Sequence, residues 1–327
     1  MAVTDTPGIK ISLFVTPEVR EEELIFANQL GVSHVFSWVH DGGITEHESL
    51  LAIRKKIESF GLTLHNLGHN KLAKVDTIHL NLAGRDQAID AFNQFIRNLG
   101  RAGIQTTTFT WEQAGARSTA LDAKARGGAL ARAVDIEALQ KEPPSHEGTY
   151  SEEELWDNFT YFMEKVIPVA EEAGVRLALH PNDPPVPQIG GIPCLIHDFE
   201  SYKRAFEIAG TDNLGMEFCV GCWLQGGRDF GDLFEGIRYC VERNRVFIVH
   251  FRNVSSPHPR FVESFVDEGY MDMYKVMKAF HEAGYDGTMV CDHTPHMIND
   301  PEDLKAIAYA TGYMKALLKC AEAEAVS

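Results

Sequence analysis

The feature that most constrains this 327-residue chain is a repeated alternation of short apolar runs with longer amphipathic segments. Runs rich in β-branched and aromatic residues predict buried strands, whereas apolar residues spaced three or four positions apart predict helices. The predicted strands cover residues 9–15, 32–39, 63–67, 106–111, 176–181, 215–220, 246–252 and 288–293. The predicted helices cover residues 17–30, 45–60, 85–102, 151–173, 198–209, 229–243, 269–283 and 301–321.

Local signals at the ends of these segments support the boundaries. Gly103 and Gly174 each stand where a predicted helix gives way to a strand. Helices often end there in left-handed backbone, which glycine adopts freely. Ser151, followed three residues later by Glu154, is typical of a helix start whose side chains cap the free N–H groups.

Eight strand–helix units in a chain of 327 residues predict a single domain, residues 1–327, folded as an α/β (β/α)8 TIM barrel. An open doubly wound sheet is the alternative, but that fold carries a glycine-rich fingerprint after its first strand, and Val15-Thr16-Pro17-Glu18 does not match it. The longest irregular stretch, residues 112–149, follows the fourth predicted strand. We expect this loop to be a lid, a binding loop or a plain surface insertion.

The charge balance limits the partners of the protein. The chain has 30 Lys and Arg against 47 Asp and Glu, a formal net charge of −17. An acidic surface repels the phosphates of nucleic acids and anionic membranes, so neither is an expected partner. The sequence shows no apolar run of membrane-spanning length and no signal-peptide pattern. Its six cysteines are scattered, so we expect a cytoplasmic protein with free thiols.

Reactive groups of a (β/α)8 barrel lie at the carboxyl ends of its strands. Four consecutive predicted strands end with a side chain that can bind a metal: His180, Cys219, His250 and Asp292. Any one of them could be an ordinary barrel residue, but four at one level favour a mixed nitrogen, sulfur and oxygen site for a divalent cation. Cys222 lacks both the second cysteine pair of a zinc ribbon and the context of a thioredoxin motif, so we expect a loop thiol without a role.

The sequence around these residues resembles the D-mannonate dehydratase family of the xylose-isomerase-like TIM-barrel superfamily. The resemblance rests on Leu-His-Pro-Asn-Asp-Pro-Pro at 179–185, Phe-Cys-Val-Gly at 218–221, Val-His-Phe-Arg-Asn-Val at 249–254, Gly-Tyr-Met-Asp-Met-Tyr-Lys-Val-Met-Lys at 269–278 and Asp-His at 292–293. It implies a Mn2+ cofactor, with Fe2+, Co2+ or Mg2+ as substitutes, held by His180, Cys219, His250 and Asp292. It also implies His293 as catalytic acid/base and Arg252 as the contact of the substrate carboxylate. A tyrosine of the last helix assists in the family, and we choose Tyr309 over Tyr313.

Two stretches depart from the family. Its third strand normally ends in a Glu-Ser-x-Pro-Val-His-Glu type sequence, whereas residues 65–70 read His-Asn-Leu-Gly-His-Asn. After the fourth strand the family usually has Pro and then Trp-Thr-Arg-Thr, whereas residues 111–114 read Trp-Glu-Gln-Ala. The resemblance implies that these loops contact the far end of the substrate, so His65, His69 and Trp111 are predicted substrate contacts. We expect Asp183 to bind a sugar hydroxyl or to order its proline-rich turn.

These inferences predict a hydro-lyase: a metal-dependent sugar-acid dehydratase that converts D-mannonate, or a related sugar acid, to 2-keto-3-deoxy-D-gluconate or its analogue and water. A histidine can take the proton beside the carboxylate, and a divalent cation can stabilise the resulting charge. The alternative is a metal-dependent sugar isomerase, epimerase or lyase acting on an oxidised sugar, because the same groups serve enolisation. The altered loops lead us to expect weak D-mannonate turnover. We also expect a homo-oligomer that binds a sugar acid or keto-sugar.

Overall fold

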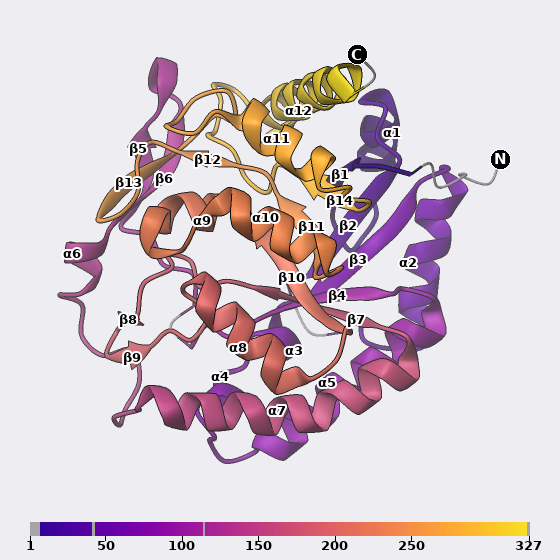
Figure 1. Cartoon of the computed structure of the whole chain (residues 1–327). Coiled ribbons are helices and arrows are strands. Elements are labelled where there is room, and N and C mark those ends of the chain that lie inside the picture. The colour runs from indigo at the N-terminus through magenta and orange to yellow at the C-terminus, as the bar shows by residue number, and fades with distance from the viewer. Residues whose placement is uncertain (1–6, 41–42, 114, 326–327) are drawn as a thin grey trace.

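The computed structural model describes residues 7–40, 43–113 and 115–325. The eight predicted strands form one sheet in the order β3-β2-β1-β14-β11-β10-β7-β4, with parallel neighbours. They are β1 (Lys10–Val15), β2 (His34–Val39), β3 (Thr63–His69), β4 (Thr106–Thr110), β7 (Arg176–His180), β10 (Leu214–Cys219), β11 (Val246–His250) and β14 (Thr288–Val290). The sheet curls into a barrel (Figure 1), which confirms the prediction of a (β/α)8 fold.

The two end strands of the sheet, β3 and β4, meet where the barrel closes. There Asn66 Nδ2 donates a hydrogen bond to Thr108 Oγ1 at 3.1 Å. Thr108 Oγ1 donates in turn to Glu217 Oε1 on β10 at 3.3 Å. All three side chains are buried, and buried polar groups are stable when they are hydrogen-bonded. This chain of side chains therefore ties the closing seam to the strand that carries Cys219.

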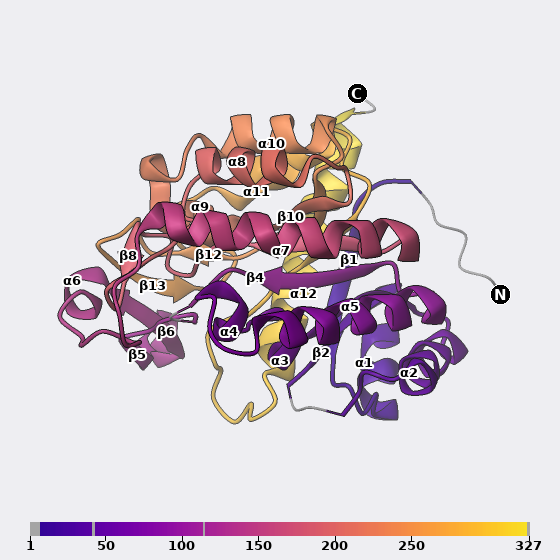
Figure 2. The ribbon, with the colours of Figure 1, turned by 90° about the horizontal axis from the view of Figure 1, so that it is seen from below.

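Helices cover the outside of the barrel (Figures 1 and 2). The helices that follow the barrel strands are α1 (Glu21–Gln29), α2 (His47–Ser59), α5 (Arg85–Ala102), α7 (Glu152–Ala173), α8 (Phe199–Ala209), α10 (Leu233–Glu242), α11 (Met273–Glu282) and α12 (Leu304–Ala325). Shorter elements lie in the loops: α3 (Asn70–Ala73), α4 (Asp76–His79), α9 (Val220–Gly226), β8 (Gln188–Ile189) and β9 (Ile192–Pro193). Ser151 and Glu154 form the predicted capping box of α7, and Gly103 and Gly174 end α5 and α7 with φ of +75° and +65°.

Residues 112–149 do not form the irregular loop that we expected, although Ala114 lies outside the described residues. They contain β5 (Ala120–Lys124), β6 (Leu130–Asp135) and α6 (Ile136–Leu139). β5 and β6 join β13 (Arg260–Ser264) and β12 (Asn253–Val254) in an antiparallel sheet of order β12-β13-β6-β5, here called the accessory sheet. The sequence does not reveal this sheet because β13, which pairs with β6, lies about 125 residues further along the chain.

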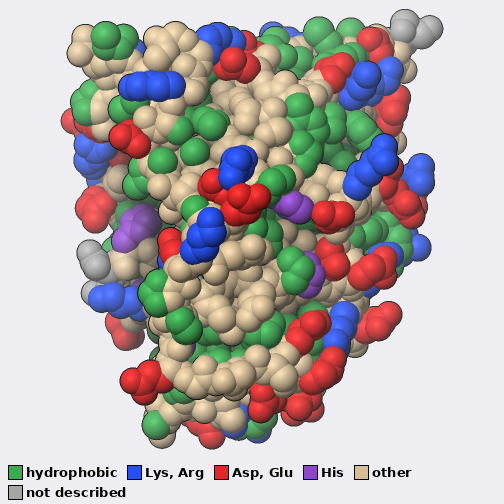
Figure 3. Space-filling model, turned by 90° about the vertical axis from the view of Figure 1, so that its left-hand side faces the viewer, with side chains coloured by type: hydrophobic (Ala, Val, Ile, Leu, Met, Phe, Trp, Pro, Cys, Tyr) green, Lys and Arg blue, Asp and Glu red, His purple; other side chains and the backbone are tan. Residues whose placement is uncertain are grey.

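The accessory sheet lies at the left of Figure 1, beyond the ends of β10 and β11. Figure 3 views the molecule from this side and shows acidic and basic side chains mixed over the surface. Within the described residues, no helix combines the length and the apolar character that crossing a bilayer requires.

The packing around Trp223 of α9 generates a prediction about stability. Trp223 stacks on Phe218 with ring centroids 5.0 Å apart, and a Cβ atom added at Gly236 of α10 would lie 2.1 Å from Trp223 Cη2. We predict that Gly236→Ala lowers the free energy of unfolding by about 1–3 kcal/mol, because the packed core must shift. In the control Gly312→Ala of α12, where the added Cβ meets no described atom within 4 Å, the free energy should rise by about 0.5–1 kcal/mol. Urea denaturation measures both, and equal effects would contradict the packing argument.

Candidate active site

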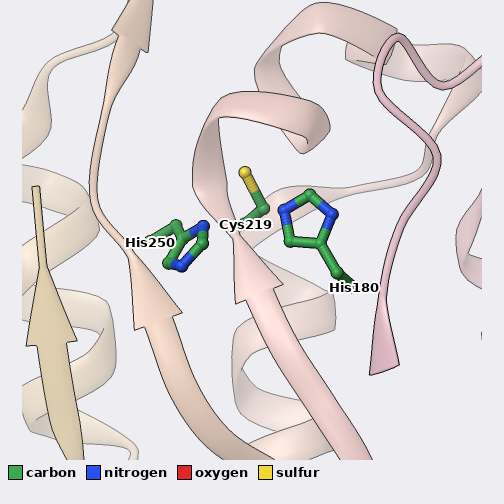
Figure 4. A group of neighbouring side chains, drawn as sticks. All are labelled: His180, Cys219 and His250. Carbon is green, nitrogen blue, oxygen red and sulfur yellow. The ribbon is translucent and has the colours of Figure 1, made fainter. Parts of the chain in front are cut away.

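Three predicted metal ligands converge at the carboxyl end of the barrel. His180, Cys219 and His250 are the last residues of β7, β10 and β11, which are neighbours in the sheet. Their ligand atoms all lie within 4.8 Å of one another. Figure 4 shows the three side chains together at the ends of neighbouring strands. The register explains this convergence, because Cys219 and His250 are directly paired between β10 and β11. We call these three residues the ligand cluster.

Each histidine of the cluster has a ring nitrogen held by a neighbouring oxygen atom. His180 Nδ1 lies 2.7 Å from the carbonyl oxygen of Pro181, to which it donates, so Nε2 carries the lone pair. His250 Nε2 lies 2.9 Å from Glu217 Oε1. His250 Nδ1 is buried and faces the Asp292 carboxylate, with Oδ2 at 3.3 Å. Metal-binding histidines are commonly oriented in this way, with the other ring nitrogen bonded to a carboxylate or carbonyl.

The third member of the cluster is a cysteine with thiolate character. Burial alone would raise the pKa of the Cys219 thiol, but a hydrogen bond from Cys222 and the charge of Arg252 lower that pKa well below its ordinary value. The thiolate is the form of cysteine that binds metals. Two imidazoles and a thiolate therefore form a donor set suited to a divalent transition metal. All six cysteines are free, as predicted.

Asp292, the predicted fourth ligand, lies beside the cluster. It is not one of the residues whose ligand atoms all lie within 4.8 Å of one another. Its Oδ2 is 3.3 Å from His250 Nδ1 and accepts a hydrogen bond from Arg252 Nε at 2.9 Å. Strand β14 ends at Val290, so Asp292 belongs to the following loop, where its φ is +61°. Strand register therefore does not place Asp292 as it places the other three residues. Its role as a ligand stays a prediction.

Arg252 and Asp183, two predicted substrate contacts, bind each other. Arg252 is 2% exposed, and it donates to Asp183 Oδ2 at 2.7 Å and to Glu263 Oε1 at 3.0 Å. Arg132 of β6 donates to Asp183 Oδ1 at 2.8 Å and to Glu263 Oε1 at 2.9 Å. Burial would raise the pKa of Asp183, but Arg132 and Arg252 lower it to about 2. In this structure the two residues are buried and paired with each other, and their substrate contacts stay predictions.

His293, the predicted acid/base, lies between two carboxylates and remains accessible. Its Nδ1 is 2.7 Å from Glu263 Oε2 and its Nε2 is 3.2 Å from Asp292 Oδ2, while 47% of the side chain is exposed. Burial opposes the charged ring, but Asp292 and Glu263 outweigh it and raise the pKa of His293. The ring opens on a cavity of about 300 Å³ whose lining includes Arg132, Glu263, Asp292, His293, Thr294 and His296. This volume is in the range of small-molecule pockets.

The structure does not bring Tyr309 to His293. Tyr309 of α12 is 40% exposed and is not among the residues that line the cavity. Its hydroxyl accepts a long hydrogen bond, 3.5 Å, from Arg126 Nη2, and Arg126 forms an ion pair with Asp267 at 2.7 Å. The other candidate, Tyr313, packs partly buried against the core. The choice of Tyr309 rested on a loose match in the last helix, and its surface contacts do not support it.

His65 is not a substrate contact in this structure. Its ring nitrogens bond to Ser12 Oγ at 2.8 Å and to Thr288 Oγ1 at 3.1 Å. Thr288 is the first residue of β14, so His65 lies toward the amino end of the barrel, away from the ligand cluster. Burial lowers the pKa of His65 to about 3, so the ring is a neutral part of the interior. The prediction was wrong because β3 extends to His69, two residues beyond its predicted end.

His69 and Trp111 are likewise core residues. His69 is 1% exposed and packs edge-on against Phe95 of α5, with ring centroids 5.6 Å apart. Trp111 is fully buried and packs against Phe159 of α7 at 5.1 Å. Side chains of a strand alternate between the barrel interior and the helix layer, and these two point outward. The predicted substrate contacts at both positions are therefore corrected.

Three residues of the candidate site were missed by the sequence analysis: Glu217, Arg132 and Glu263. Glu217 stands two positions before Cys219 on β10, so strand alternation could have placed it on the same face. Arg132 and Glu263 lie on the accessory sheet, which the sequence did not reveal. No local signal pointed to either of them.

The fold and the site define a (β/α)8-barrel protein with a candidate metal centre beside an accessible histidine. The family model described as D-mannonate dehydratase (UxuA) matches residues 20–147 and 135–324. The chain belongs to the D-mannonate dehydratase family.

Individual relatives agree with this assignment. The chain is 29% identical over 298 residues to mannonate dehydratase 2 of Halalkalibacterium halodurans, covering 80% of this chain and 84% of that protein. It is 28% identical over 298 residues to mannonate dehydratase of Thermotoga maritima, covering 77% and 78%. The crystal structure of mannonate dehydratase from Streptococcus suis superposes with a TM-score of 0.89 at 25% identity, covering 98% and 96%. An L-ribulose 3-epimerase, at 15% identity and a TM-score of 0.64, shares the fold.

Proposed function

We propose that the protein is a sugar-acid dehydratase, a hydro-lyase that removes water from D-mannonate or a close relative to give a 2-keto-3-deoxy acid. Membership of the D-mannonate dehydratase family supports this activity. The observation that carries the proposal is the position of His293 beside the ligand cluster. Asp292 Oδ2 lies 3.3 Å from His250 of the cluster and 3.2 Å from His293, so one oxygen atom adjoins both.

The donor set supports a divalent cation at the ligand cluster. Two imidazole lone pairs and a thiolate favour a transition metal, so we propose Mn2+, with Fe2+ or Co2+ as alternatives and Mg2+ as the least suited. His180, Cys219 and His250 would hold the ion, with Asp292 as the adjacent carboxylate. When bound, such an ion supplies Lewis-acid stabilisation of the negative charge that develops on the substrate carboxylate.

His293 is the group that moves the proton. Dehydration removes a proton from the carbon next to the carboxylate and expels hydroxide from the neighbouring carbon. A histidine can accept the first proton and return one to the departing hydroxide, because its pKa lies near neutrality. The buried Arg252 acts indirectly, by holding Asp292 and Glu263 on either side of His293.

The corrections to the site change what we expect of the substrate. His65 and Trp111 were two reasons to expect weak D-mannonate turnover, but His65 lies toward the amino end of the barrel and Trp111 packs against α7. D-mannonate is therefore the first substrate to test. The alternative, an isomerase or epimerase, uses the same cation and base but keeps the water in the product. The reaction product consequently separates the two functions.

We predict that the protein loaded with Mn2+ converts D-mannonate to a product lighter by one water. Dehydration should proceed with kcat/KM of about 10⁴ M⁻¹s⁻¹ or more, the lower end of ordinary enzyme efficiency. Mass spectrometry of the product and a chemical assay for 2-keto-3-deoxy acids measure the reaction. A product of unchanged mass, from D-mannonate or from a keto-sugar, would support the isomerase instead.

We predict one tightly bound divalent ion per chain and its loss on ligand substitution. Cys219→Ser and His250→Asn should retain little metal because each removes a donor. Glu217→Gln should weaken metal affinity by about 10–100-fold because the partner that orients His250 is altered. Cys320→Ser is the matched control, since Cys320 is an exposed thiol. Elemental analysis measures the content, and wild-type content in Cys219→Ser and His250→Asn would refute the cluster as the site.

We predict that His293→Asn keeps its metal and fold but loses about 10²–10⁴-fold in kcat, because an acid/base group is gone. Tyr309→Phe should keep its activity, since the hydroxyl contacts Arg126 outside the cavity. Steady-state kinetics with matched metal content measures both variants. Near-wild-type kcat in His293→Asn would remove this histidine from the mechanism, and a large loss in Tyr309→Phe would restore the tyrosine to it.

A further inference from the structure

Glu263 holds the shortest contact that His293 makes with a carboxylate. Glu263 Oε2 lies 2.7 Å from His293 Nδ1, compared with 3.2 Å between Asp292 Oδ2 and Nε2. The Glu263 side chain is 6% exposed and comes from β13 of the accessory sheet, which is not a barrel strand. The candidate acid/base is thus contacted by a residue from outside the barrel.

The orientation of the Glu263 carboxylate is imposed by its other oxygen. Oε1 accepts hydrogen bonds from Arg252 Nη1 at 3.0 Å and from Arg132 Nη1 at 2.9 Å. With Oε1 engaged by two guanidinium groups, Oε2 is the oxygen left for His293. Charge-assisted hydrogen bonds of this kind are strong and directional. The carboxylate therefore presents one defined acceptor to the imidazole.

An acceptor at Nδ1 decides which nitrogen of His293 carries the proton when the ring is neutral. Nδ1–H donates to Glu263, so the lone pair resides on Nε2. Nε2 is also the nitrogen on the side of Asp292 and the ligand cluster. A carboxylate that accepts a hydrogen bond from Nδ1–H of a catalytic histidine keeps the lone pair on Nε2. It also stabilises the imidazolium that forms when Nε2 accepts a proton.

We propose that Glu263 is the positioning residue for His293, and that the accessory sheet is therefore part of the active site. This inference rests on the proposed acid/base role of His293. Arg132, from β6 of the same sheet, supports the arrangement by bonding both Glu263 and Asp183. Residues 112–149, which the sequence suggested were a loop, thus supply Arg132, and β13 of the same sheet supplies Glu263.

Glu263→Gln tests the proposal because the two arginines dictate how the new amide must lie. The amide oxygen should face Arg132 and Arg252, which only donate hydrogen bonds. The amide NH2 should then face His293 and donate to Nδ1. The proton of the neutral ring is thereby forced to Nε2, where Asp292 can accept it. The substitution preserves size and should preserve the fold, but it reverses the tautomer.

The first measurement is of the ring itself. Proteins labelled with 15N-histidine and freed of paramagnetic ions are compared by NMR at a pH alkaline enough to keep His293 neutral, with the His293→Asn spectrum identifying the signals among the 14 histidines. We expect the Nδ1–H form in the wild type and the Nε2–H form in Glu263→Gln. Asp135→Asn, which alters an exposed ion pair with Arg260 in the same accessory sheet, should keep the wild-type signals.

The second measurement is kinetic. In Glu263→Gln, kcat should fall by about 10²–10⁴-fold while KM and metal content change little, because the wrong tautomer cannot accept the proton. Adding Glu263→Gln to His293→Asn should cause no comparable further loss, since residues that act as a unit are not additive. A merely structural role would predict additive losses instead.

The outcomes separate this inference from the proposed function. Wild-type tautomer signals or wild-type kcat in Glu263→Gln would overturn the positioning role, as would additive losses in the double variant. If the wild type dehydrates no sugar acid, the proposed function fails. The NMR comparison would still decide whether Glu263 sets the tautomer of His293.

Discussion

Two buried guanidinium groups, those of Arg252 and Arg132, are the constraint on which the site depends. They are 2% and 11% exposed, and together they contact Asp183, Glu263 and Asp292. Buried charges persist only when they are paired, and breaking such a pair costs about 3–5 kcal/mol. The carboxylates are therefore held where the guanidinium groups require them. Because Glu263 and Asp292 lie on either side of His293, this network determines where the reactive imidazole lies.

The site combines two structural units with different tasks. Barrel strands β7, β10 and β11 end in the ligand cluster, whose geometry follows from parallel register. The accessory sheet contributes Arg132 and Glu263, and Glu263 contacts His293, the proposed acid/base. Asp292 adjoins both units, since its Oδ2 approaches His250 and His293. The barrel itself is shared with an L-ribulose 3-epimerase, so the fold alone does not specify the reaction.

The sequence placed residues correctly where local structure decides their position. It failed where contacts between distant segments decide it. His180, Cys219 and His250 were placed correctly because strand period and parallel register put strand ends at one level. His65 was misplaced because β3 extends two residues further than predicted, and Trp111 because its side chain points outward against α7. Substrate roles inferred for those two residues failed for that reason.

By itself the sequence determined the barrel, the family and the ligand cluster, because these follow from local periodicity, helix caps and short motifs at strand ends. Tertiary structure alone decided that β6 pairs with β13, and that Glu263 contacts His293, 30 residues away. It also decided that Arg252 is buried and pairs with Asp183, Glu263 and Asp292. These contacts join segments that are distant along the chain. The pairing of buried charges depends on the tertiary structure and produces no periodic pattern in the sequence.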